Sequence, residues 1–139
     1  MNELKLIEDL LIEFGHSVSK ETINGFNMLT LKGEGSKNKL ESLISITLYP
    51  VDDNDIKTRL IQFYFEFKPN SKYSTKSIND ILFKKMKEVP YGNFNYHEEN
   101  IYYKYVLVCK ENTIEKEIIY DIINVLYYTI DVVIDEIIN

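Results

Sequence analysis

The residues in this chain best suited to chemistry are two histidines, one cysteine and some scattered carboxylates. Neither His16 nor His97 has a histidine or carboxylate four residues away, the spacing that lets one helix face hold a metal ion. Glu98 and Glu99 follow His97, and we interpret this group as a polar turn with at most a weak surface cation site. Cys109 has no second cysteine, which favours a small buried side chain. No nucleophile and base are paired along the sequence, so we expect no enzyme activity, no metal and no cofactor.

Two segments superficially resemble ligand-binding motifs. Residues 52–55 read Asp-Asp-Asn-Asp, but an EF-hand loop counted from Asp53 would need Gly and Glu where the chain has Thr58 and Tyr64. Residues 33–37 read Gly-Glu-Gly-Ser-Lys, which lacks the spacing of a phosphate loop and joins two predicted strands. We therefore predict a solvated hairpin loop at 52–55 and a turn at 33–36.

The charge and composition restrict the possible partners. The formal net charge is −6 and Arg59 is the only arginine, so clustered cations for phosphate contacts are scarce. We expect no nucleic-acid partner. Lys84, Lys85 and Lys87 form a local basic group, which we interpret as the solvated face of a helix.

A length of 139 residues suits a single domain spanning 1–139. The N-terminus lacks a basic segment followed by an apolar run, so we expect no signal peptide. Carboxylates interrupt the apolar C-terminal segment, at Asp121, Asp131, Asp135 and Glu136, so we expect no membrane insertion. We therefore expect the protein to be cytoplasmic.

Hydrophobic periodicity predicts an α+β fold with the element order α-β-β-β-α-β-β-α. The first helix is expected to stop at Gly15 and the second at Pro90, and capping boxes are expected at Ser77 with Asp80 and at Asn112 with Glu115. Short connections favour an antiparallel sheet with the helices packed mainly on one face. The predicted helices are 2–14, 77–88 and 113–138, and the predicted strands are 26–32, 42–49, 57–67, 92–96 and 101–109.

The terminal helix has a thin polar edge. Its polar positions recur at steps of four and three, which places them on one line: Glu117, Asp121, Asn124, Tyr128, Asp131 and Asp135. Most other positions are Ile, Val, Leu or Tyr. A helix this apolar must be covered on more than one side, so we predict either a central helix or half of a subunit interface.

Strand alternation assigns an inner and an outer face to the sheet. The outer face mixes tyrosines and aliphatic side chains with a few hydrogen-bonding groups, a composition typical of an interface rather than of a wet surface. The alternative explanation is the generally high tyrosine content of the chain, with eleven residues. We predict partner-binding residues at Tyr49, Leu60, Tyr64, Tyr102 and Val106. The expected inner residues are Leu29, Leu31, Ile44, Ile46, Leu48, Ile61, Phe63, Phe65, Phe94, Tyr103, Tyr105 and Leu107.

The element order resembles the type III secretion chaperone-like fold, which includes the class I secretion chaperones and the YbjN family. The segments that carry the resemblance are 4–15, the strands ending at 61–65, the helix 77–88, the hairpin 92–109 and the final helix. The resemblance implies a small, acidic, homodimeric adaptor or chaperone that binds a partly unfolded protein segment. A YbjN-like member would instead have a regulatory role.

Two other functions are compatible with the sequence. An immunity protein that neutralises a toxin would also be small and acidic, because negative charge speeds association with a basic partner. A small enzyme is the third possibility, since catalytic residues can converge in space without a sequence motif.

Overall fold

The computed structural model describes residues 3–32, 43–53, 55–70, 72–88 and 92–137, with side chains for all of these except Lys32, Leu43 and 132–137. These residues form three helices and a six-stranded antiparallel sheet, so the predicted α+β class is confirmed. The helices are α1 (Glu3–Glu13), α2 (Thr75–Glu88) and α3 (Lys116–Ile137). The strands are β1 (Val18–Ile23), β2 (Phe26–Lys32), β3 (Leu43–Asp53), β4 (Ile56–Phe67), β5 (Asn93–His97) and β6 (Asn100–Lys110).

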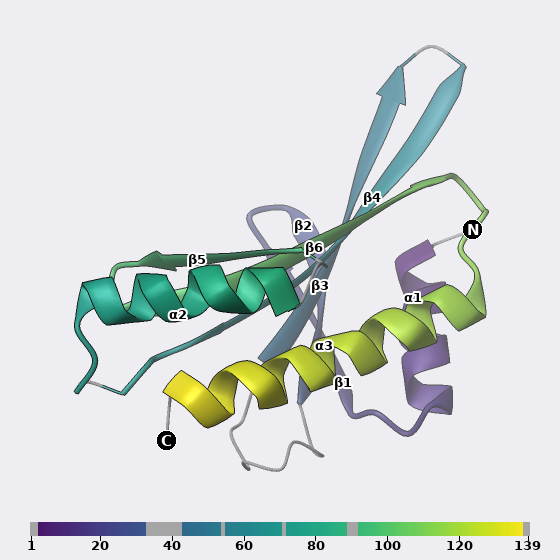
Figure 1. Cartoon of the computed structure of the whole chain (residues 1–139). Helices are drawn as coiled ribbons and strands as arrows, with labels where there is room; N and C mark the ends of the chain where they lie inside the picture. Colours follow the sequence, from purple (N-terminus) through teal and green to yellow (C-terminus); the bar gives the residue numbers. More distant parts are fainter. Residues whose placement is uncertain (1–2, 33–42, 54, 71, 89–91, 138–139) are drawn as a thin grey trace.

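The sheet has the spatial order β1-β2-β3-β4-β6-β5, and every neighbouring pair is antiparallel. Figure 1 shows all three helices on one side of this twisted sheet, with α3 running between α2 and α1. The tip of the β3–β4 hairpin projects beyond the helices. We call the face that carries the helices the inner face and the opposite one the outer face.

The element order contains one strand more than predicted. The segment 16–25, predicted as a loop, contains β1, which pairs with β2 from Val18↔Leu31 to Ile23↔Phe26. All of β1 except Val18 is exposed, so an edge strand of this kind carries no alternating apolar pattern. The signal that was overlooked is Asn24-Gly25: both residues have positive φ, 52° and 83°, as a tight hairpin turn requires.

Two helix starts also differ from the prediction. Helix α2 begins at Thr75, and its cap is Ser74, whose Oγ accepts a hydrogen bond from the backbone N–H of Ser77 at 3.2 Å. Helix α3 begins at Lys116 rather than at 113. The N–H of Asn112 is bound elsewhere, to Glu3 Oε2 at 3.3 Å.

Some predicted features fall outside the described residues. These are the turn at 33–36, the first residues of the helix predicted from Asn2 and of the strand predicted from Ser42, Asn54 in the predicted loop 52–55, the helix stop at Pro90, and Ile138 at the end of the last predicted helix. The stop at Gly15 is confirmed, because α1 ends at Glu13 and the N–H of His16 closes the last turn onto the carbonyl of Leu11 at 3.0 Å.

The hydrophobic core lies between the inner face and the helices. Nine of the twelve predicted inner residues are buried, and the other three, Leu48, Tyr105 and Leu107, pack against them half-buried. The predicted assignment of inward-facing residues is therefore confirmed on β2, β3, β4, β5 and β6. The helices contribute Leu4, Ile7 and Leu11 from α1, Ile78 and Leu82 from α2, and Ile119, Ile122, Ile123, Leu126 and Ile130 from α3.

Helix α3 is the central helix of the helical layer. This is one of the two arrangements that the sequence predicted for it. It contacts both α1 and α2, and its apolar stripe packs on the sheet (Figure 1). The predicted polar line is the exposed side at Glu117, Asp121, Asn124 and Tyr128. Asp131 is half-buried, and the side chain of Asp135 lies outside the described set.

The lone arginine connects three distant segments at one end of the sheet. Arg59 on β4 donates from Nε to Glu3 Oε1 at 2.7 Å and from Nη1 to Asp52 Oδ1 at 2.8 Å. Its Nη2 lies 3.5 Å from Glu111 Oε1. Since Glu3 also accepts the Asn112 N–H, this cluster attaches the start of α1 to the connection that leads into α3.

We expect Ile123→Ala to lower the free energy of unfolding by about 2–5 kcal/mol, because it leaves a cavity in a core position that is 1% exposed. The matched control is Ile118→Ala on the same helix, 40% exposed, which should change stability by no more than about 0.5 kcal/mol. Chemical denaturation of both variants measures the difference. Equal losses would contradict the described orientation of α3.

Candidate functional site

The outer face of the sheet is the candidate site, because none of the described helices covers it. An apolar row crosses five strands there. Ile23 pairs with Phe26, Tyr49 pairs with Leu60, and Leu60 pairs with Val108. The rings of Phe26 and Tyr49 connect these pairs between β2 and β3, with centroids 5.2 Å apart. We call these five residues the apolar row.

The apolar row is accessible to a partner. Ile23, Phe26 and Val108 are 49%, 47% and 64% exposed, whereas Tyr49 and Leu60 are half-buried. Isolated exposed apolar side chains are common, but a row of them on neighbouring strands indicates an interaction surface. The row continues toward the projecting hairpin, where Val51 and Ile56 are 48% and 67% exposed.

The neighbouring row of outward-facing residues is more polar and forms one edge of this surface. Met28 pairs with Thr47, Thr47 with Gln62, and Gln62 with Val106. Two hollows of about 310 and 470 Å³ adjoin each other here, because both are lined by Met28, Thr47 and Tyr49. A partner side chain can therefore insert next to the apolar row and find hydroxyl and amide groups to bind.

A tyrosine cluster borders this surface on β4 and β6. The rings of Tyr64 and Tyr102 have centroids 6.0 Å apart, and Tyr64 Oη donates to Glu66 Oε2 at 2.8 Å. Burial raises the pKa of the Tyr64 hydroxyl well above its usual value, and the hydrogen bond to Glu66 raises it further. The phenol therefore stays neutral to a higher pH than an ordinary tyrosine.

The five predicted partner-binding residues all lie on the outer face, but in two groups. Tyr49 and Leu60 belong to the apolar row, and Val106 lies beside it at 40% exposure. Tyr64 and Tyr102 belong to the tyrosine cluster.

The most exposed members of the row were not predicted as binding residues. Ile23 lies in the segment predicted as a loop, and Phe26 and Val108 share the alternation of Met28 and Val106. Extending that alternation by one step along each strand would have found Phe26 and Val108.

The other candidate residues do not converge. His16 stacks on Tyr127, at 5.7 Å between centroids, and burial lowers the pKa of His16. His97 is exposed in its hairpin, and burial raises the pKa of the half-buried Cys109. Asp52 is engaged by Arg59. Among the described residues, no group of three or more His, Cys, Asp or Glu side chains is placed to hold a metal ion.

The basic group on α2 differs from the prediction in one residue. Lys84 and Lys87 are exposed, but Lys85 is only 5% exposed and lies 3.0 Å from Glu88 Oε2. Its aliphatic stem packs inward, as long charged side chains can do beside an apolar surface.

Comparison with known proteins does not assign the chain to a family: no family model matches it, and a search of curated proteins gives no match. In the part of the chain that the structure describes, no helix combines the length and the hydrophobicity needed to cross a bilayer.

We expect Tyr64 to ionise above the ordinary tyrosine pKa of 10.0, and Glu66→Gln to bring its pKa closer to that value. Ultraviolet titration of tyrosinate measures both, with Tyr64→Phe identifying the signal. Because the folded pKa exceeds the unfolded one, the stability contributed by Tyr64 is present below pH 10.0 and lost as the pH rises further. An unchanged titration in Glu66→Gln would show that the hydrogen bond does not perturb Tyr64.

Proposed function

We propose that the chain is a non-enzymatic protein-binding module, chaperone- or adaptor-like, that holds an extended apolar segment of a partner protein on its outer face. The observation that carries the proposal is the apolar row, which lies exposed on neighbouring strands with two hollows beside it. Hydrogen-bonded strands give this surface a rigid backbone, so little ordering entropy is lost when a partner binds.

The composition of the surface supports a peptide partner. The row offers two aromatic and three aliphatic side chains, and the tyrosine cluster adds a hydrogen-bonding rim. Aromatic contacts surrounded by polar groups are typical of surfaces that bind protein segments.

The proposal includes a homodimer formed through the helical layer. On α2, Phe83 is 62% exposed with Lys87 Nζ 4.8 Å from its ring centroid, and Lys84 is exposed beside it. On α3, Tyr128 is 64% exposed, and Glu117 is exposed on the same side. Two copies related by a two-fold axis along the layer would place the basic α2 over the acidic side of α3.

We expect short peptides rich in aliphatic and aromatic residues to bind the wild-type chain, and Phe26→Asp to weaken that binding at least about tenfold, as loss of a central apolar contact does. Peptide arrays followed by fluorescence anisotropy on selected peptides measure this. The control is Phe83→Asp, which places the same charge on the helical layer and should bind normally. Equal binding by Phe26→Asp and wild type would contradict the proposal.

We expect light scattering across a dilution series to give a dimer for the wild type and a single-chain mass for Phe83→Asp. A buried aspartate at the proposed helical interface would lack a partner, which is costly. Here Phe26→Asp is the control and should remain dimeric. A monomeric wild type would contradict the proposed homodimer. If Phe26→Asp is monomeric while Phe83→Asp stays dimeric, the interface lies on the outer face rather than on the helical layer.

A further inference from the structure

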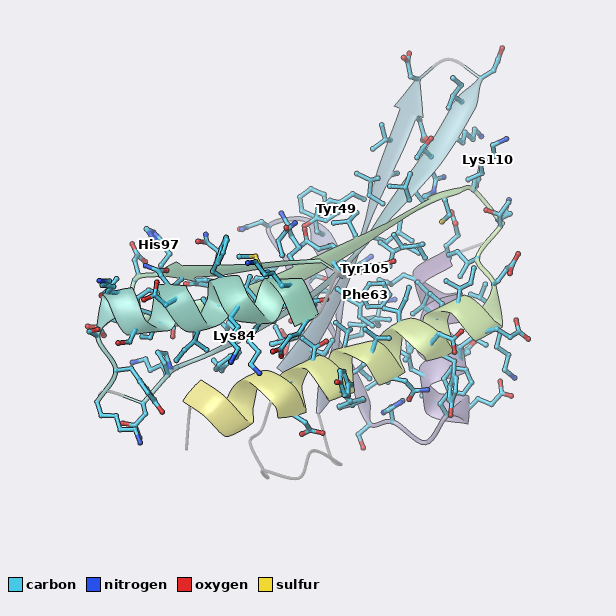
Figure 2. All side chains as sticks on the ribbon, in the orientation of Figure 1. Tyr49, Phe63, Lys84, His97, Tyr105 and Lys110 are labelled. Carbon is cyan, nitrogen blue, oxygen red and sulfur yellow. The ribbon has the colours of Figure 1, made fainter. Side chains whose placement is uncertain are left out.

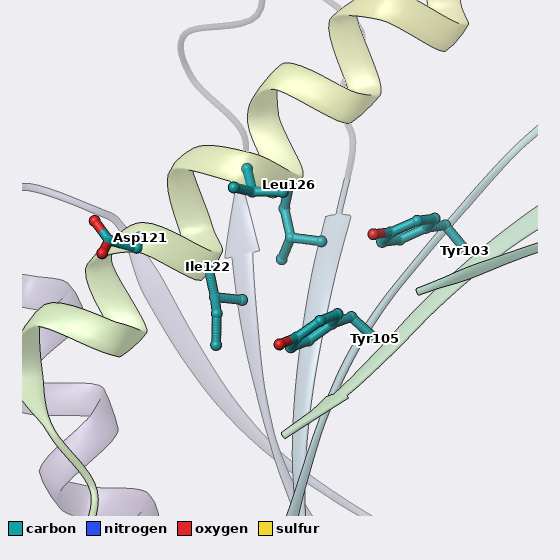
Figure 3. Close-up of a pocket in the computed structure, with 6 residues that line it drawn as sticks. Tyr103, Tyr105, Asp121, Ile122 and Leu126 are labelled. Atoms are coloured by element: carbon teal, nitrogen blue, oxygen red, sulfur yellow. The ribbon is translucent and has the colours of Figure 1, made fainter. Parts of the chain in front are cut away.

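A third hollow lies on the inner side of the sheet, between α3 and β6. It has a volume of about 160 Å³ and is lined by Tyr103, Tyr105, Asp121, Ile122, Val125 and Leu126. Figure 3 shows the two tyrosine rings pointing from β6 toward the helix, while the Asp121 carboxylate points away from them. The space inside is therefore bordered by rings and aliphatic groups. The apolar row lies on the opposite face of the sheet, so this hollow is separate from the surface described above.

The hollow has a rigid floor and an accessible side. Tyr103 is 0% exposed and forms the floor. Its ring stacks on Phe65, with centroids 5.0 Å apart, and lies 4.8 Å from the ring of Phe94. Side chains packed this closely hold each other in place, so the floor keeps its shape. Tyr105 and Val125 are only half-buried, so the hollow is reached from the surface beside α3.

The volume matches one aromatic ring. Apolar cavities of about 150 Å³ hold a single benzene ring, and this hollow of about 160 Å³ is of that size. Tyr103 and Tyr105 offer such a ring edge and offset-stacked contacts. A phenylalanine side chain that projects from another molecule fits this space, whereas the two fused rings of a tryptophan exceed it.

Phe83 on α2 carries such a ring on the helical layer. Its side chain is 62% exposed, and Lys87 Nζ lies 4.8 Å from its ring centroid. Phe83 does not line the hollow of its own chain. Its ring therefore projects from the same layer that contains the hollow, and a second copy of the chain can receive it.

The charges around the ring and around the hollow are complementary. Lys84 and Lys87 are exposed beside Phe83 on α2, and Glu117 and Asp121 are exposed on α3. The Asp121 carboxylate lies on the side of α3 away from the tyrosine rings (Figure 3). A phenylalanine that enters the hollow beside α3 brings its neighbouring lysines across the helix, toward these carboxylates. Attraction between opposite charges then favours this orientation of the two copies.

We propose that Phe83 of each copy inserts its ring into the hollow between α3 and β6 of a second copy. Because a two-fold axis repeats every contact, one pair of copies makes two identical insertions. The insertion rests on the proposed homodimer and specifies it, since it names the residue that each copy contributes and the site that receives it.

The direct test is an isotope-filtered NMR experiment on a dimer mixed from labelled and unlabelled wild-type chains. We expect intermolecular nuclear Overhauser contacts between the ring protons of Phe83 and the methyl groups of Ile122, Val125 and Leu126. A dimer that lacks these contacts would overturn the insertion and leave the homodimer standing. A monomeric wild type would contradict both.

Substitutions that change ring size test the fit without adding a charge. Phe83→Trp should weaken the dimer at least about tenfold in sedimentation equilibrium, because two fused rings overfill a hollow that holds one. Val125→Phe fills the hollow from its own chain and should weaken the dimer likewise. The control is Ile12→Trp, at a 53% exposed position on α1, which should keep the wild-type affinity.

Unchanged or tighter association of Phe83→Trp would overturn the insertion, because a flat apolar contact gains from a larger side chain. If Val125→Phe does not fold, Phe83→Trp decides the question, since it changes an exposed position and leaves the core intact.

Discussion

The structure depends on the one-sided burial of a six-stranded antiparallel sheet. Inward residues on the central strands, such as Ile46, Ile61 and Phe63, are completely buried beneath the helices. Strand geometry then places the intervening residues on the other face. Three helices are enough to cover one face of a sheet this wide, and the hydrophobic effect of that single core stabilises the fold without a second layer. The exposed outer face follows from the same alternation that builds the core.

The three surfaces of interest therefore have different physical origins. The outer face is apolar because its strands carry aromatic and aliphatic residues on both sides. The outward side of the helical layer is charged, basic on α2 and acidic on α3, with isolated exposed rings at Phe83 and Tyr128. Between α3 and β6 lies a hollow of about 160 Å³, where Tyr103 and Tyr105 face Ile122 and Leu126 (Figure 3). The ring of Tyr105 also lies beside that of Phe63, with centroids 6.2 Å apart (Figure 2).

Electrostatics in this chain serve architecture more than reactivity. Arg59 and Glu3 form an ion pair that is largely shielded from water, and Asn112 and Asp52 complete its hydrogen bonds. Such a cluster restrains the positions of α1, the β3–β4 hairpin and the start of α3, because the rigid planar guanidinium group presents its donors in fixed directions. The hydrogen bond from Tyr64 to Glu66 also has a structural role, since it connects two residues on the outer side of β4.

The sequence by itself determined most of the strands, the inner face and the α+β class. The reason is that alternation of apolar and polar residues, as at 42–49 and 57–67, is a local pattern that does not depend on how the elements are arranged. It also determined that the outer face would be unusually apolar. Only the tertiary structure decided that Ile23 and Val108 lie in one row with Tyr49, since lateral neighbours depend on strand order and register. Likewise, Arg59 meets Glu3 although the two residues lie 56 positions apart in the sequence, a distance over which no local pattern specifies a contact. The overlooked edge strand β1 has the same cause: its pairing with β2, rather than its own side chains, makes it a strand.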